Sequence, residues 1–342
     1  MHYYGKPNFD HASRSLVGIL LTNVGTPASP TARDVRPYLA QFLGDRRVIE
    51  WPRWLWLPVL HGIILRTRPR RSARLYARIW TDAGSPLLDY LRRQAAGLQE
   101  LLAARSSLPV KVAVGMRYGA PSIASALREL DAAGARRILV FPLFPQYSAT
   151  TTATTLDAVF DELKRWRWMP ELRTINHYHD DEGYLAALEA SVRESWAEHG
   201  QGQRLLLSFH GVPQSYVDNG DPYYVECQET ARLLAGRLNL QEGAWGYAFQ
   251  SRFGPVEWLR PYTSDVLAQW GQERLQSVDV ICPGFSADCL ETVDEIAHEG
   301  RETFQEAGGG RFTYIPALNA RPDHIEALGR IVFERLGGWE RE

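Results

Sequence analysis

One histidine of the chain follows directly after an apolar, strand-like run. His210 comes after LLLSF and before the turn-forming GVP, so its imidazole lies where a strand is expected to end. A histidine in that position can act as a base near neutral pH or as a metal ligand. The alternative is a ring satisfied by backbone groups in a loop, and position alone leaves both interpretations open.

A second reactive segment, GFSADCLE at 284–291, follows another apolar run and opens a helix. On an α-helical wheel Glu291, Glu295 and His298 share one face, and such a row could pass protons or hold a hard cation. The spacing of Asp288 and Glu291 also fits a capping box, in which both side chains serve the start of the helix. Acidic faces are often simply solvated, so a structural interpretation stands beside the catalytic one.

Two further apolar runs also end in polar side chains. Arg117 and Tyr118 follow VKVAVGM, and an arginine there can pair with a substrate carboxylate or form a structural salt bridge. Tyr147 and Ser148 belong to PQYSATTT, whose hydroxyls suit helix capping or the binding of substrate carboxylates.

Several common functions lack their signatures. The sequence has no GxGxxG, no Walker A loop and no GxSxG elbow, which disfavours nucleotide-dependent and hydrolase readings. A net charge of −2 gives no electrostatic case for nucleic acid. The three cysteines, Cys227, Cys282 and Cys289, form no CxxC pair, and with a polar N-terminus they predict a cytoplasmic, reducing location.

The elements that must carry these residues are short apolar runs alternating with amphipathic stretches. Near-continuous apolarity is typical of strands buried on both faces of a parallel sheet, and the alternation indicates βαβ units. The strand candidates are 17–24, 110–116, 137–144, 173–178, 204–209, 245–251, 278–284 and 311–317. These runs predict an α/β protein with two four-stranded parallel sheets, one per domain, flanked by helices. Ligands of such sheets bind beyond the carboxyl ends of the strands.

The length of 342 residues suits two domains. We expect a first domain at 1–160 and a second at 161–321 that carries His210 and Glu291. A C-terminal helix at 322–338 is available to pack back on the first domain.

Six segments resemble the ferrochelatase family in the family's order, along nearly the whole chain. They are LLTNVGTP, YARIWTDAGSPLL, VGMRYG, FPQYSATTT, LLSFHGVP and CPGFSADCLETVDEI. The resemblance implies two Rossmann-like domains with the active-site cleft between them. It also implies insertion of Fe²⁺ into protoporphyrin IX with release of two protons, the last step in the synthesis of heme b.

The resemblance also implies roles for individual residues. His210 and Glu291 correspond to the family's active-site histidine and glutamate, as catalytic and metal-contacting residues, and which of them takes protons stays open. Asp288 and Glu295 fit the acidic path. The resemblance assigns substrate binding to Arg117, Tyr118, Val24, Tyr147, Ser148 and Phe285. Two positions depart from some members, which have methionine at Val24 and histidine at Cys289.

No cofactor is expected, because Fe²⁺ and protoporphyrin IX are substrates. The chain ends soon after its last helix without a cysteine-bearing tail, and three thiols cannot supply four ligands, so no iron–sulfur cluster is expected. The alternatives are a chelatase for coproporphyrin or cobalt, and a non-catalytic porphyrin carrier.

The segment 51–65, WPRWLWLPVLHGIIL, is unusually apolar, and Pro52 and Pro58 make it a poor spanning helix. A strongly basic stretch follows it. Tryptophans favour the bilayer interface and arginines meet anionic headgroups, so the segment predicts an exposed lip that touches the inner membrane surface. The alternative is ordinary core packing.

Overall fold

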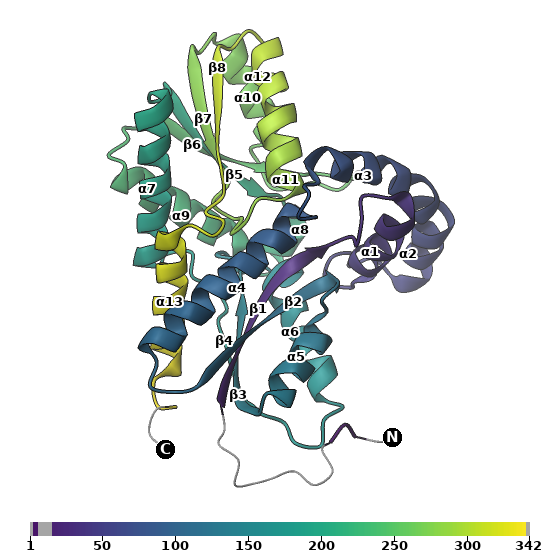
Figure 1. Cartoon of the computed structure of the whole chain (residues 1–342). Helices are drawn as coiled ribbons and strands as arrows, with labels where there is room; N and C mark the ends of the chain where they lie inside the picture. The colour runs from purple at the N-terminus through teal and green to yellow at the C-terminus, as the bar shows by residue number, and fades with distance from the viewer. Residues whose placement is uncertain (1–2, 6–15, 340–342) are drawn as a thin grey trace. The chain divides into compact units, whose positions relative to one another are not determined.

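The computed structural model describes residues 3–5 and 16–339. Residues 1–2, 6–15 and 340–342 lie outside them, and with them most of the polar N-terminal stretch and the start of the expected first domain. The chain divides into two compact units (Figure 1). The first comprises Met1–Leu143, Ala149–Asn176 and Ile325–Glu342, and the second comprises Phe144–Ser148 and His177–His324.

The first unit is built on a four-stranded parallel sheet, in the order β2-β1-β3-β4 within the described residues. The strands are β1 Leu16–Thr26, β2 Val110–Gly119, β3 Ala135–Pro142 and β4 Glu171–Thr174. Gly25 sits near the end of β1 with φ +116°, and a Cβ there would lie 1.9 Å from the carbonyl oxygen of Tyr118. Only glycine therefore lets the ends of β1 and β2 approach this closely.

Helices cover this sheet and form a lobe at its edge. They are α1 Ala32–Gly44, α2 Arg53–Val59, η1 Leu60–Ile64, α3 Leu65–Ile79, α4 Pro86–Arg105, α5 Ile123–Ala132, η2 Ala149–Ala153, α6 Thr154–Leu163 and α13 Pro322–Leu336. Leu127 and Val159 pack with Ile138 in the buried core between α5, α6 and the sheet. The helix α13 lies beside α4 (Figure 1), where a Cβ at Gly97 would come within 3.2 Å of Ile325.

The second unit repeats this plan with the order β6-β5-β7-β8 among its described residues. Its strands are β5 Arg204–His210, β6 Trp245–Gln250, β7 Ser277–Ile281 and β8 Arg311–Ile315. Its helices are α7 Glu182–His199, α8 Gln214–Asp218, α9 Tyr223–Arg237, α10 Thr263–Gln272, α11 Leu290–Thr292, η3 Val293–Gly300 and α12 Arg301–Glu306. Leu206, Val280 and Phe304 belong to its buried core.

The order of the strands locates the place where each sheet can hold a ligand. In both sheets the chain crosses from one central strand toward one edge and from the other central strand toward the opposite edge. Ligands of such sheets bind beyond the carboxyl ends of these two strands. In the second unit these strands are β5, which ends at His210, and β7, which leads into the segment 284–291. The predicted fold of two four-stranded parallel sheets flanked by helices is confirmed. The strands overlap their predicted apolar runs, although β4, Glu171–Thr174, shares only Arg173 and Thr174 with the predicted 173–178.

Helix length and hydropathy bear on membrane insertion. Within residues 3–5 and 16–339, every helix is too short or too polar to cross a bilayer.

Candidate active site

His210 is the last residue of β5, and its ring is half-buried. Its Nδ1 lies 2.6 Å from the carbonyl oxygen of Gly211. A carbonyl only accepts hydrogen bonds, so Nδ1 must carry the proton, and Nε2 is the nitrogen left to act as a base or metal ligand. Gly211 is needed here because a Cβ would lie 2.8 Å from the carbonyl oxygen of Gln250 on β6.

Glu291 lies at the start of α11 and is half-buried. The capping box expected for Asp288 and Glu291 is wrong. Cys289 is the N-cap residue, its backbone N–H donates to Thr292 Oγ1 at 3.0 Å, and the side chains of Cys289 and Thr292 form the box. Glu291 therefore takes no part in the capping box, and its charge lies close enough to the Cys289 thiol to help raise the pKa of that thiol, after burial.

The helix that follows is a π-helix, η3, rather than the α-helix assumed for the helical wheel. Its i→i+5 hydrogen bonds widen each turn, so residues seven apart no longer share a face. His298 is exposed, whereas Glu291 and Glu295 are half-buried, and the expected row of three side chains therefore does not form. Short π-helical segments occur frequently at functional sites.

Glu295 is bound by the residue that follows β6. The backbone N–H of Ser251 donates to Glu295 Oε1 at 2.6 Å, and the Ser251 hydroxyl donates to Oε2 at 2.5 Å. In the β5–β6 register His210 pairs with Gln250, so Ser251 and Glu295 lie in the neighbourhood of His210. Burial raises the pKa of Glu295 above its ordinary value, although the Ser251 hydrogen bonds and the charge of His210 oppose this.

Asp288 is buried, and both of its carboxylate oxygens accept hydrogen bonds. Its Oδ1 accepts hydrogen bonds from Thr292 Oγ1 at 2.9 Å and Tyr314 Oη at 2.5 Å, and its Oδ2 accepts one from Asn319 Nδ2 at 2.7 Å. A carboxylate with this many donors is well suited to fixing the loop before α11. Of the two residues expected in an acidic path, Glu295 therefore has the better surroundings for proton transfer.

Arg117 and Tyr118 end β2 and converge on a carboxylate that the sequence did not single out. Arg117 Nη2 and Tyr118 Oη both donate to Asp45 Oδ2, the latter at 3.0 Å, and Arg117 Nε donates to Thr154 Oγ1 at 2.7 Å. The Arg117 guanidinium also lies 4.7 Å from the centre of the Tyr118 ring. The structural salt bridge considered for Arg117 is therefore present, and its substrate-binding role stays a prediction.

The remaining predicted substrate residues also lie at strand ends. Val24 and Phe285 are half-buried, near the ends of β1 and β7. Tyr147 and Ser148 follow β3 and belong to the second unit. Tyr147 N–H donates to Glu226 Oε2 at 2.7 Å, and the buried Ser148 hydroxyl donates to Asp221 Oδ2 at 3.0 Å.

Sequence reasoning missed Asp45, Gln250 and Ser251. Gln250 Nε2 donates to the carbonyl oxygen of Glu291 at 2.6 Å and so ties the end of β6 to α11. The available signal was the polar pair that ends the apolar run 245–251, the same kind of signal that identified His210. Asp45 offered none, because the side chains that bind it, those of Arg117, Tyr118 and Thr154, lie more than seventy residues away.

The fold defines the class of protein. SirB from Bacillus subtilis, solved with Fe³⁺, superposes with a TM-score of 0.58 at 14% identity, over 95% of this chain and 97% of that one. The structure of CbiX, described as the terminal enzyme of siroheme biosynthesis in denitrifying bacteria, gives 0.51 at 14% identity, over 94% and 100%. The two-sheet architecture is thus the fold of the chelatases.

The sequence narrows the class further. The ferrochelatase family model matches residues 16–336. The ferrochelatase of Thioalkalivibrio sulfidiphilus is 55% identical over 99% of this chain and 92% of that protein, and the ferrochelatase of Nitrosococcus oceani is 52% identical over the same shares. The chain belongs to the ferrochelatase family, the enzymes of heme biosynthesis that insert ferrous iron into protoporphyrin IX. The resemblance seen in the sequence is confirmed, and the chain is a metal-inserting enzyme.

Proposed function

We propose that His210 and Glu291 carry out the insertion of Fe²⁺ into protoporphyrin IX, with Glu295 as the next proton acceptor. The reaction exchanges two pyrrole N–H protons for one metal ion, so the site must accept protons while it delivers a cation. The observation that carries the proposal is the hydrogen bond from His210 Nδ1 to the Gly211 carbonyl. With Nδ1 protonated, Nε2 is the nitrogen whose lone pair can take a proton or touch the metal.

The surroundings of Glu295 support its role as acceptor. A carboxyl group whose pKa is raised by burial holds a proton at a higher pH than an ordinary glutamate. Glu291 precedes Glu295 by four residues on the same helical stretch, and its side chain takes no part in the capping box. Protons taken from the pyrrole nitrogens can therefore pass from Glu291 to Glu295.

Replacing Glu291 with glutamine tests this assignment. The amide keeps the shape of the side chain but cannot take a proton, so turnover should fall strongly while porphyrin binding and melting temperature change little. General acid–base catalysis typically contributes about 10²- to 10⁴-fold, which sets the expected loss. A loss of melting temperature with nearly normal turnover would instead give Glu291 a purely structural role.

The porphyrin and the metal can be varied to separate the alternatives. We expect iron insertion into protoporphyrin IX to be faster than insertion into coproporphyrin, and faster than cobalt insertion. Stoichiometric porphyrin binding without turnover would identify a carrier.

We propose that the enzyme holds no iron–sulfur cluster. Cys227, Cys282 and Cys289 are all buried, and burial raises the pKa of each thiol well above its ordinary value. Metal binding requires thiolates, so these surroundings oppose it. The visible spectrum of the anaerobically purified protein should lack charge-transfer bands, and a clear cluster spectrum would contradict the proposal.

We also propose that the segment 51–65 contacts a membrane surface. Several of its large apolar side chains are exposed to solvent, with exposed fractions of 76% for Trp54, 60% for Ile63 and 47% for Trp51. Trp56 is an exception to the expected lip, since it is buried and its Nε1 donates to the Leu43 carbonyl at 2.7 Å. The segment is thus anchored by one tryptophan and presents others outward, as a surface that contacts a bilayer requires.

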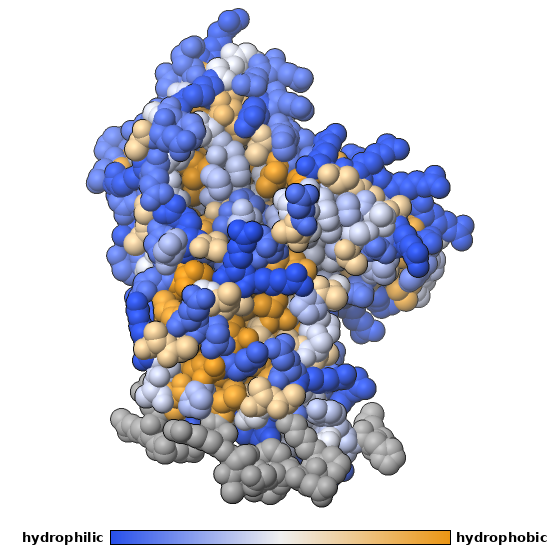
Figure 2. All heavy atoms as spheres, in the orientation of Figure 1, coloured by the Kyte–Doolittle hydropathy of each residue, from blue (hydrophilic) through white to orange (hydrophobic). Residues whose placement is uncertain are grey.

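Cationic side chains lie immediately beyond this apolar surface. Arg66, Arg68, Arg70 and Arg71 are all exposed on α3. Figure 2 shows hydrophilic side chains next to pale and apolar ones on the lobe of α1 to α3. Each arginine near an anionic bilayer contributes about 1 kcal/mol of attraction.

Vesicle binding tests the membrane contact. Trp54→Ser combined with Ile63→Ser should leave the melting temperature unchanged and weaken sedimentation with phosphatidylglycerol vesicles. Phe160→Ser on α6, which removes another exposed apolar side chain (44% exposed), is the matched control and should bind as the wild type does. Equal binding of all three proteins would refute the membrane contact, and unfolding of the double variant would assign the segment to the core.

A further inference from the structure

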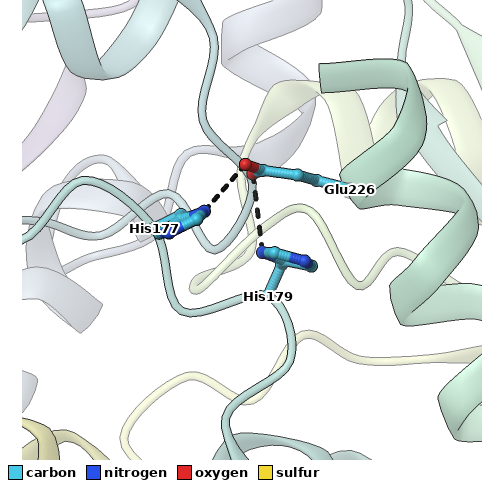
Figure 3. A group of neighbouring side chains, drawn as sticks. All are labelled: His177, His179 and Glu226. Atoms are coloured by element: carbon cyan, nitrogen blue, oxygen red, sulfur yellow. Dashed lines mark hydrogen bonds and ion pairs between the residues drawn. The ribbon is translucent and has the colours of Figure 1, made fainter. Parts of the chain in front are cut away.

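Two histidines and a glutamate of the second unit form a cluster that the proposed reaction does not use. His177 and His179 lie in the segment between β4 and α7, and Glu226 lies in the first turn of α9. One ligand atom from each residue lies within 4.8 Å of those of the other two. Figure 3 shows both imidazoles turned toward the single carboxylate.

The nitrogen atoms that face the carboxylate are both Nδ1. His177 Nδ1 lies 2.7 Å from Glu226 Oε1, and His179 Nδ1 lies 3.5 Å from Glu226 Oε2. His179 is 6% exposed, and among the described residues its Nδ1 has no hydrogen-bond partner. A buried ring nitrogen left without a donor or acceptor costs free energy, so its aim at a carboxylate calls for an explanation.

The other nitrogen of His179 supplies that explanation. Its Nε2 lies 3.1 Å from Glu229 Oε2, one turn further along α9. A carboxylate accepts from a protonated nitrogen, so Nε2 carries the hydrogen of the neutral ring and Nδ1 carries the lone pair, directed at the cluster. Metal-binding histidines commonly donate the N–H of one ring nitrogen to a carboxylate, which orients the other nitrogen toward the metal.

The carboxylate is also fixed in position. Glu226 is buried, with 9% of its side chain exposed, and its Oε2 accepts a hydrogen bond from the backbone N–H of Tyr147 at 2.7 Å. A carboxylate oxygen has further lone pairs, so this hydrogen bond leaves room for a metal. His177 is 48% exposed and forms the open side through which an ion and water could enter.

We propose that His177, His179 and Glu226 bind one divalent transition-metal ion of the zinc or ferrous class. Two neutral imidazoles and one carboxylate with an open position form a donor set suited to such ions, whereas calcium and magnesium prefer oxygen ligands alone. Metal–nitrogen bonds of about 2.0–2.1 Å separate tetrahedral ligand atoms by roughly 3.4 Å. The 3.5 Å between His179 Nδ1 and Glu226 Oε2 is close to that value. The 2.7 Å between His177 Nδ1 and Glu226 Oε1 is a hydrogen bond, whose proton the ion would displace. The ion would tie the segment before α7 to α9, independently of His210 and Glu291.

The test is binding of Zn²⁺ alone to the purified full chain. Wild-type protein equilibrated with Zn²⁺ and passed through a desalting column should retain one more equivalent than His177→Ala and one more than Glu226→Gln. His177 is half-exposed, and glutamine preserves the shape and the acceptor for Tyr147, so both variants should fold. Their melting temperatures without metal check this. Because Zn²⁺ can also bind at His210 and Glu291, the difference between proteins, and not the total, is the readout.

A second variant tests the role of the supporting carboxylate. Glu229→Gln leaves all three ligands in place, and loss of such a supporting partner typically weakens metal binding about 10- to 100-fold. His199→Ala removes an exposed histidine at the end of α7 and is the matched control, which should retain Zn²⁺ as the wild type does. Unchanged Zn²⁺ stoichiometry and affinity in His177→Ala and Glu226→Gln would overturn the proposal and leave a hydrogen-bonded ion pair only.

Discussion

Replacing Asp45 with asparagine should destabilise the first unit far more than the same change at Asp157. Both aspartates pair with an arginine, Asp45 with Arg117 and Asp157 with Arg47. The first pair is largely buried, with side chains 7% and 22% exposed, whereas the second is 44% and 40% exposed. The two variants therefore make the same chemical change at different depths.

The expected magnitudes follow from burial. Removing one partner of a buried ion pair costs about 3–5 kcal/mol, and the lower end, about 3 kcal/mol, applies because asparagine still accepts hydrogen bonds from Thr154 and Tyr118. At roughly 2–4 °C per kcal/mol for a unit of this size, Asp45→Asn should lower the melting temperature by about 6–12 °C. Asp157→Asn should cost about 0–1 kcal/mol, or less than about 4 °C.

The effect should also depend on pH. Burial alone would raise the pKa of Asp45, but hydrogen bonds from Thr154 and the Arg47 backbone, and the charge of Arg117, hold it below its ordinary value. The stability contributed by the charged form is therefore present above the ordinary pKa and is lost as pH falls through the lowered one. Calorimetry from neutral to acidic pH should show the difference between wild type and Asp45→Asn shrinking in that range. Equal melting temperatures for the two variants, or a difference that does not change with pH, would refute the reasoning.

Two other changes test the strand ends. Gly25→Ala places a Cβ against the Tyr118 carbonyl at positive φ, so it should destabilise the protein by about 1–3 kcal/mol or more. Gly62→Ala meets open space and should be nearly neutral, and equal melting temperatures would contradict the account of the β1–β2 contact. Ser251→Ala removes a hydrogen bond that lowers the pKa of Glu295, so that pKa should rise further. Because the pKa of Glu295 is higher in the folded than in the unfolded protein, its protonation stabilises the fold at low pH, and this stability is lost as pH rises through the folded pKa. In the variant the loss of stability should therefore extend to higher pH. Carboxyl titration by NMR measures the shift, and an unchanged pKa would contradict it.

The strands could be predicted because each is a continuous apolar run. The runs 204–209 and 278–284 include β5 and β7, which are buried on both faces, as their near-continuous apolarity predicts. The same reasoning placed His210 and the segment 284–291 each at the carboxyl end of a strand. The pairing of β5 with β7, which makes these ends neighbours, is known from the structure.

The π-helix and the long-range pairs could not be predicted in this way. Eight residues of η3 contain too few turns for periodicity to separate a π-helix from an α-helix, so His298 was assigned to the wrong face. The pairing of Asp45 with Arg117 joins residues 72 positions apart, and that of His177 with Glu226 joins residues 49 apart. Such contacts depend on the tertiary fold, which local spacing does not encode.

The most direct test of the central claim is iron insertion by His210→Ala. Nε2 of His210 is the nitrogen proposed to take a proton or touch the metal, so the variant should fold with a wild-type melting temperature and still bind protoporphyrin. Its rate of Fe²⁺ insertion, followed by the loss of porphyrin fluorescence, should fall by at least about 10²-fold, the lower end for acid–base catalysis. His199→Ala, which changes an exposed histidine of the same unit, should insert iron at the wild-type rate. Near-normal insertion by folded His210→Ala would contradict the account.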